Sequence, residues 1–278
     1  MNFQLPISVI LSIFFRSYSR WSKMWIFLAE QEGRIYMNIL SIGNSFSYDA
    51  ARYLHQIARS DGTELNCANI HIGGCSLWRH YVNAMDETKK YGLQYNGMDT
   101  MFNVTMKEAL INREWDIITL QQVSIQSVDY QTYQPYLDFI KEYVKKYCPK
   151  AKIYIHQTWE YGKEHTALKS VLGYDEPSQM LADIRKVYNE AANAIDADGI
   201  IPSGELIGLL VTDGIKIHRD DQHVSLGLGR YALGLLWYAY LTGRDVANNT
   251  FADFDEAIEK KYILRAKECV AAVLRKQK

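Results

Sequence analysis

Short apolar runs that alternate with helical patterns limit this chain to one broad class of fold. Five runs have the aliphatic content and bounding residues typical of buried strands: Ile39–Ile42, Asn66–Ile72, Trp115–Gln122, Ala151–Ile155 and Ile200–Pro202. Patterns with helical spacing separate them, among them residues 48–58, 133–147 and 225–241. This order predicts a three-layer α/β/α sandwich around a mostly parallel sheet of five strands.

The same pattern sets the domain boundaries. From Met37 to Lys278 no linker, repeat or low-complexity tract interrupts it, so residues 37–278 are predicted to form one domain. Residues 79–103 are polar and show little periodicity. We expect them to form a long excursion above the edge of the sheet.

Residues 1–36 differ in character and are predicted to be an N-terminal extension. Leu5–Phe15 is mostly apolar but falls short of the roughly 20 residues that span a bilayer, so no stable membrane span is expected. Three roles stay open: an extension without a structural role, which we favour, a poor export signal, or a peripheral anchor. The protein is expected in the cytoplasm if translation starts at Met37, and outside it if the apolar run acts as a signal.

Charge and cysteine content exclude several classes of function. With a formal net charge of −1, the chain has no excess of positive charge that would attract nucleic acid or an anionic membrane. The four cysteines are scattered and form no Cys-x-x-Cys or Cys/His cluster, so neither a metal site nor a disulfide framework is indicated. We expect all four to be buried as small hydrophobic side chains.

Ser45 lies where the first predicted strand passes into a helix. Gly43 closes that strand, so Ser45 is expected at the carboxyl edge of the parallel sheet, where open α/β sheets bind ligands. Amides at a helix start also favour negative charge that develops beside them. Serine is otherwise a common N-cap, so only a second chemical group at the same edge distinguishes a nucleophile from a cap.

Asp220 and His223 supply that second group. They lie in a polar loop after the fifth predicted strand. An aspartate three residues before a histidine on a turn can hold the imidazole in one tautomer and leave its other nitrogen free to take a proton. A nucleophile, a base and an orienting acid are what serine hydrolysis requires.

These two segments resemble motifs of a known superfamily. The block Gly43–Ser47 resembles the Gly-Asp-Ser block of the SGNH/GDSL hydrolases, with Asn44 in place of the aspartate. Asp220-x-x-His223 resembles the carboxyl-terminal catalytic block of that superfamily. The resemblance runs from Met37 to about Leu241 and is to an uncharacterised bacterial subgroup. It implies a flavodoxin-like sandwich that hydrolyses esters without a metal or an organic cofactor.

The resemblance also implies roles for single residues. Ser45 would be the nucleophile, His223 the general base and Asp220 the partner of that base. The oxyanion hole would use the amide of Ser45 and the amide of Gly74, with Gly73 as the alternative.

The third oxyanion donor departs from the superfamily pattern. That pattern commonly has Gly-x-Asn after the third strand, where this chain has Gln121 and Gln122. The side-chain amide of Gln122 is predicted to take this role, with Ser124 as its competitor. Losing one such donor typically costs about 10²- to 10³-fold in turnover.

Other hydrolase and nucleotide motifs are absent. Gly43–Ser47 lacks the closing glycine of the Gly-x-Ser-x-Gly elbow, which argues against an α/β-hydrolase fold. It also lacks the glycines and lysine of a phosphate-binding loop.

Aromatic residues provide the clue to the substrate. Trp78, Trp159 and Tyr161 come from loops expected around Ser45, and are predicted to bind substrate. Aromatic platforms beside a polar site suit sugar rings, although lid and core packing would use the same residues.

The leading hypothesis is a serine esterase that removes an acyl group, acetyl above all, from a carbohydrate or other small polar ester through an acyl-enzyme. The alternative is a catalytically silent glycan-binding module on the same fold. A third, weaker hypothesis is a membrane-attached protein that docks through residues 1–36.

Overall fold

A computed structural model describes residues 36–277. The predictions for the N-terminal extension therefore lie outside the described residues, apart from Tyr36. Within 36–277, no helix combines the length and the apolar character that crossing a membrane requires.

Within residues 36–277, the centre of the fold is one sheet of seven strands, in the spatial order β4-β3-β2-β1-β5-β6-β7. The strands are β1 (Tyr36–Gly43), β2 (Glu64–His71), β3 (Tyr91–Tyr95), β4 (Met98–Val104), β5 (Ile117–Leu120), β6 (Lys152–His156) and β7 (Gly199–Ile201). The five predicted strands are β2, β1, β5, β6 and β7, and each pairs with its neighbour in parallel. The predicted α/β sandwich is therefore confirmed, with two strands more than expected.

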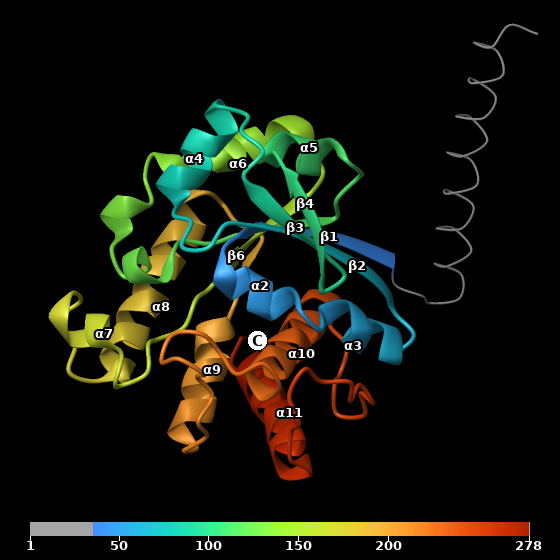
Figure 1. The fold of residues 1–278 in the computed structure, drawn as a ribbon, viewed down its shortest axis with the longest axis vertical. Coiled ribbons are helices and arrows are strands. Elements are labelled where there is room, and N and C mark those ends of the chain that lie inside the picture. The colour runs from blue at the N-terminus through green and yellow to red at the C-terminus, as the bar shows by residue number, and fades with distance from the viewer. Residues whose placement is uncertain (1–35, 278) are drawn as a thin grey trace, which may run out of the picture.

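Helices cover both faces of the sheet (Figure 1). The helices are α2 (Ser45–Ala51), α3 (Leu54–Ser60), α4 (Leu77–Met85), α5 (Met106–Ile111), α6 (Tyr136–Tyr147), α7 (Thr166–Ser170), α8 (Pro177–Ala194), α9 (Ser203–Thr212), α10 (Leu228–Thr242) and α11 (Lys260–Arg275), with short 3₁₀ turns at Ser124–Gln126 and Tyr130–Thr132. α2, α3, α9, α10 and α11 share one hydrophobic core, and α4, α5, α6 and α8 share the other. The single helix predicted at 48–58 is two short helices, α2 and α3.

Alternation along the strands supplies both cores. In β1, Ile39 belongs to the first core, whereas Leu40 and Ile42 belong to the second. In β5, Ile117 and Ile118 divide in the same way. Successive side chains of a strand point to opposite faces, so a sheet that is covered on both faces needs nearly continuous apolar runs. This is why the five parallel strands are visible in the sequence.

The prediction of a long loop at residues 79–103 is wrong. This segment contains most of α4 and the antiparallel hairpin β3–β4, and β3 also pairs antiparallel with β2. Met98, Met101 and Phe102 on the edge strand β4 are exposed, so this strand shows no apolar alternation. The hairpin turns at Asn96 and Gly97, which both have positive φ, at 50° and 81°. Two such residues are what a type I′ turn requires.

Strand order places Ser45 at the point of the sheet edge where ligands of such folds bind. Numbered along the chain, the five parallel strands have the order 2-1-3-4-5 of a flavodoxin-like sheet, and the order reverses between β1 and β5. Ser45 follows β1, and Gln121 and Gln122 follow β5. Ligands of such sheets bind outside the carboxyl ends of the strands at this reversal.

The hairpin turn provides a test of the fold. A Cβ at Gly97 would overlap the carbonyl oxygen of Arg52, and the positive φ adds strain. Gly62 also has positive φ, at 68°, but open space around its Cβ position. Gly62→Ala should cost about 1 kcal/mol, and Gly97→Ala should cost at least about 2 kcal/mol. Urea unfolding measures both; equal losses would contradict the close approach of the hairpin to Arg52.

Candidate active site

The end of β1 and the start of α2 hold Ser45. Asn44 caps the helix in an extended conformation, and its Oδ1 accepts a hydrogen bond of 3.1 Å from the amide of Phe46. Gly43 permits a tight approach, because a Cβ there would lie 2.5 Å from Oγ of Ser47. Ser45 is thus the first helical residue, and its own side chain is not used as the cap.

His223 reaches Ser45 from a segment 178 residues further along the chain. Nε2 of His223 lies 2.8 Å from Oγ of Ser45, and Nδ1 of His223 lies 2.9 Å from Oδ2 of Asp220. A carboxylate accepts, so Nδ1 is the protonated nitrogen and Nε2 accepts from the Ser45 hydroxyl. The structure therefore brings the three residues predicted for catalysis into one hydrogen-bonded chain.

The loop around Asp220 is itself ordered by hydrogen bonds. Oδ1 of Asp220 accepts from the amides of Gln222 and His223, at 3.1 and 2.6 Å. Burial by itself would raise the pKa of Asp220, but these amides and the His223 ring outweigh it and hold the pKa below its usual value. The carboxylate is therefore ionised throughout the neutral range.

A buried ion pair fastens this loop to α2. Asp49, one turn after Ser45, is fully buried, and its Oδ2 accepts from Nη1 of Arg219 at 2.9 Å. Its Oδ1 accepts from Nε of Arg230 at 2.8 Å. Arg219 directly precedes Asp220, and its amide donates to the carbonyl of His223. Asp49 therefore joins the nucleophile helix to the loop that carries the base through Arg219, and to α10 (Leu228–Thr242) through Arg230.

The glycine turn after β2 also lies against the start of α2. The amide of Ile72 donates to the carbonyl of Gly43, and Nδ2 of Asn44 donates 3.1 Å to the carbonyl of Cys75. Gly73 and Gly74 between them are exposed, and Gly74 has a φ of 63°. Asn44 thus connects the turn that contains Gly74 to the first turn of the helix that begins at Ser45.

Gln122 does not have the geometry predicted for a third oxyanion donor. Its side chain is fully buried, and Nε2 donates to the carbonyl and the hydroxyl of Thr132, both at 3.1 Å. Its Oε1 accepts from the amides of Leu77 and Val123. All of these partners belong to neighbouring loops, so Gln122 connects loops and has no free N–H for a substrate.

Ser124, the predicted competitor, is also engaged. Its hydroxyl is buried, lies 2.8 Å from the hydroxyl of Tyr161, and accepts from Nε2 of Gln222 at 3.1 Å. Gln222 lies in the loop that carries Asp220 and His223, so these hydrogen bonds help to hold that loop in place.

Two of the three predicted substrate-binding aromatics are buried instead. Trp159 has no exposed surface: its ring packs 4.0 Å from that of Phe46, and its Nε1 donates to the carbonyl of Gln222. Tyr161 is only 2% exposed. Neither ring offers a face to a sugar, so both position the loop of His223. Trp78, at 53% exposure, remains available.

Gln121 was not assigned a role from the sequence pattern, yet its side chain bonds to Asn44, the residue next to the nucleophile. Its Nε2 donates 2.6 Å to Oδ1 of Asn44, and its Oε1 accepts from Nδ1 of His156 at 2.7 Å. The only sequence signal is its place at the end of β5, beside the reversal of strand order.

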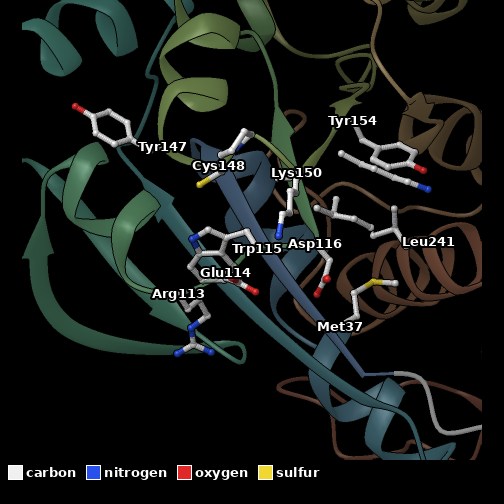
Figure 2. Close-up of a pocket in the computed structure, with 14 residues that line it drawn as sticks. Met37, Arg113, Glu114, Trp115, Asp116, Tyr147, Cys148, Lys150, Tyr154 and Leu241 are labelled. Carbon is white, nitrogen blue, oxygen red and sulfur yellow. The ribbon is translucent and has the colours of Figure 1, made fainter. Parts of the chain in front are cut away.

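Neither a metal cluster nor the cavity in Figure 2 belongs to this site. Within the described part of the chain, no group of three or more His, Cys, Asp or Glu side chains could hold a metal ion, and the four cysteines are free and buried. The cavity, of about 470 Å³, is bordered by Met37, Asp116 and Lys152 (Figure 2). These residues are at the amino ends of β1, β5 and β6, the sheet edge opposite Ser45.

Comparison with known sequences and structures identifies relatives of this chain. A sequence model of DUF4886, a domain of unknown function, matches residues 38–269. The crystal structure of a DUF4886 family protein from Bacteroides uniformis is 32% identical, covers 87% of this chain and 96% of its own, and has a TM-score of 0.80. No curated protein matches the chain.

A more distant similarity concerns the fold. A protein from Slackia heliotrinireducens, provisionally assigned to the SGNH hydrolases, is 22% identical over 74% of this chain and 99% of its own, with a TM-score of 0.54. The α/β sandwich implied by the resemblance to the SGNH/GDSL superfamily is thereby confirmed.

Burial of His156 predicts a pH dependence of stability. Burial lowers the pKa of His156 to about 3. An unfolded histidine has a pKa of about 6.5, so below that pH the unfolded chain binds a proton that the folded ring does not, and acid favours unfolding. Between pH 8 and pH 5 this should remove about 2 kcal/mol of stability.

Asparagine does not titrate. In urea unfolding, the loss of stability between pH 8 and pH 5 should therefore be about 2 kcal/mol smaller in His156→Asn than in the wild type. His80, whose pKa burial also lowers to about 3, is present in both proteins and cancels in the comparison. Parallel pH profiles for the two proteins would contradict a neutral His156.

Proposed function

This chain belongs to the DUF4886 family, and we propose from the geometry of its site that it is a serine esterase. The observation that supports this most directly is the continuous chain of hydrogen bonds from Ser45 Oγ through His223 to Asp220. Each of the three groups has the orientation that nucleophilic catalysis needs: a hydroxyl that donates to Nε2, and a ring whose Nδ1–H donates to a carboxylate.

The proposed reaction runs in two steps. Ser45 Oγ attacks the ester carbonyl while Nε2 of His223 takes its proton, and the Asp220 carboxylate stabilises the imidazolium that forms. The ring then gives this proton to the leaving alcohol, and the acyl group stays on Ser45. In the second step His223 takes a proton from water, whose oxygen attacks the acyl carbon. The ring then returns this proton to Ser45 Oγ as the bond between Oγ and the acyl carbon breaks, and the acid is released.

The proposed oxyanion hole consists of the amides of Ser45 and Gly74. Ser45 is the first residue of α2, and the amides of a first helical turn have no acceptor within the helix. The Gly73–Gly74 turn lies beside it through the bond from Asn44 to Cys75. Both donors are backbone groups, so they are rigid and cost no reorganisation when charge develops.

For the substrate we propose a small polar ester, with an acetylated carbohydrate as the preferred class. The support is Trp78, which is 53% exposed at the start of α4, four residues after Gly74. A flat exposed ring at that position suits the apolar face of a sugar. Trp159 and Tyr161 no longer contribute to this proposal.

Covalent labelling tests the nucleophile. A fluorophosphonate probe should label the wild-type protein and fail to label Ser45→Ala, because only an activated serine hydroxyl forms the adduct. Ser47→Ala is the matched control: its hydroxyl is buried two residues away, bonded to Asn44 and Asn69, and labelling should persist. Labelling that survives in Ser45→Ala would contradict the proposal.

Sugar binding without turnover in the wild type would support the alternative, a non-catalytic glycan-binding module.

Truncation of Trp78 tests the substrate class. Trp78→Ala should raise KM for an acetylated sugar about fivefold, the loss expected for one stacking contact, and leave hydrolysis of nitrophenyl acetate unchanged. Phe102→Ala, an exposed aromatic on edge strand β4, is the control and should change neither. An equal effect of Trp78→Ala on both substrates would show that the ring does not recognise the sugar.

A further inference from the structure

We propose that Gln121 is a positioning residue for the esterase reaction, connecting the buried ring of His156 to Asn44 and so holding both proposed oxyanion amides in register. This inference rests on the proposed function. Gln121, Asn44 and His156 are each at most 2% exposed, so solvent cannot replace their hydrogen bonds.

Asn44 joins the two halves of the proposed oxyanion hole. Its Oδ1 accepts from the amide of Phe46 and thereby fixes the first turn of α2, in which Ser45 lies. Its Nδ2 donates to the carbonyl of Cys75 and thereby fixes the turn that contains Gly74. A rotation of this one side-chain amide would therefore disturb both donors together.

Gln121 and the amide of Phe46 together hold Asn44 in one orientation. The amide of Phe46 can only donate, so the atom of Asn44 that faces it must be Oδ1. Gln121 lies 2.6 Å from the same Oδ1 and must offer its own Nε2. The opposite arrangement would place two acceptors in contact inside the protein, at the cost of a lost buried hydrogen bond.

His156 fixes Gln121 in turn. With Nε2 of Gln121 committed to Asn44, its Oε1 faces Nδ1 of His156 at 2.7 Å, so that ring nitrogen must carry the proton. Nε2 of His156 has no hydrogen-bond partner among the described residues, and the ring packs edge-on against Trp237. The one polar task of this ring is therefore the donation to Gln121.

Gln121 also has no room to move toward β1. A Cβ on Gly43 would lie 2.9 Å from Oε1 of Gln121, which shows how closely the amide packs on the backbone that leads to Ser45. Its hydrogen bonds and this contact hold it in a single arrangement.

Kinetics of paired variants test the role. Gln121→Met keeps the size of the side chain but loses both hydrogen bonds. We expect kcat for nitrophenyl acetate to fall on the order of 10²-fold with KM nearly unchanged, because a small misplacement of catalytic groups slows the chemical step without weakening substrate binding. At His156, Asn places an N–H near the position of Nδ1, whereas Leu has none. His156→Asn should keep kcat within about threefold of wild type, and His156→Leu should resemble Gln121→Met.

The outcomes separate this role from packing and from the esterase proposal itself. Equal losses in His156→Asn and His156→Leu, or a folded Gln121→Met with wild-type kcat, would overturn the positioning role. If Gln121→Met does not fold by circular dichroism, the His156 pair decides alone. Turnover that survives in Ser45→Ala would instead refute the esterase proposal, whereas loss there with full activity in Gln121→Met refutes only the role of Gln121.

Discussion

Everything in the site depends on two distant segments being held against each other. Ser45 begins α2, and His223 lies in a loop 178 residues later that contributes no strand to the sheet. The buried carboxylate of Asp49 on α2 pairs with Arg219 in that loop. A buried charge is costly unless it is paired, so movement of the loop away from α2 would remove one of the two arginines that compensate Asp49. This constraint keeps an imidazole within hydrogen-bonding distance of the hydroxyl before a substrate arrives.

Packing against the loop of His223 adds a second constraint. The ring of Trp159 packs on that of Phe46, and its Nε1 donates to the carbonyl of Gln222. The hydroxyl of Ser124 bonds to Gln222 and to Tyr161. The loop backbone is thus supported by side chains that follow β5 and β6, which are neighbouring strands of the sheet. Groups fixed in this way suit a reaction that needs donors and a base already in place.

Much of this architecture is predictable because the responsible signals are local. Parallel strands buried on both faces must be nearly continuously apolar, so β1, β2, β5, β6 and β7 are found from short apolar runs and the residues that bound them. Ser45 follows from a short motif at a predicted strand end, and Asp220 and His223 follow from a short motif in a polar loop. The hairpin β3–β4 escapes because β4 exposes both faces, although Asn96-Gly97 is a strong turn signal that was available in the sequence.

The remaining errors concern side-chain direction. Trp159, Tyr161 and Gln122 do lie at the expected edge, but burial and hydrogen bonding, which only the fold determines, turn them toward the loops instead of the substrate. The same holds for Gln121, whose role depends on Asn44 and His156 meeting it from other strands.

The most direct measurement is mass spectrometry of the protein quenched in acid during turnover of a nitrophenyl ester. A covalent acyl group on the peptide that contains Ser45, present during turnover and lost when the substrate is exhausted, is the predicted result. Turnover with no acylated peptide, or with the acyl group on another residue, would contradict the assignment of Ser45 as the nucleophile.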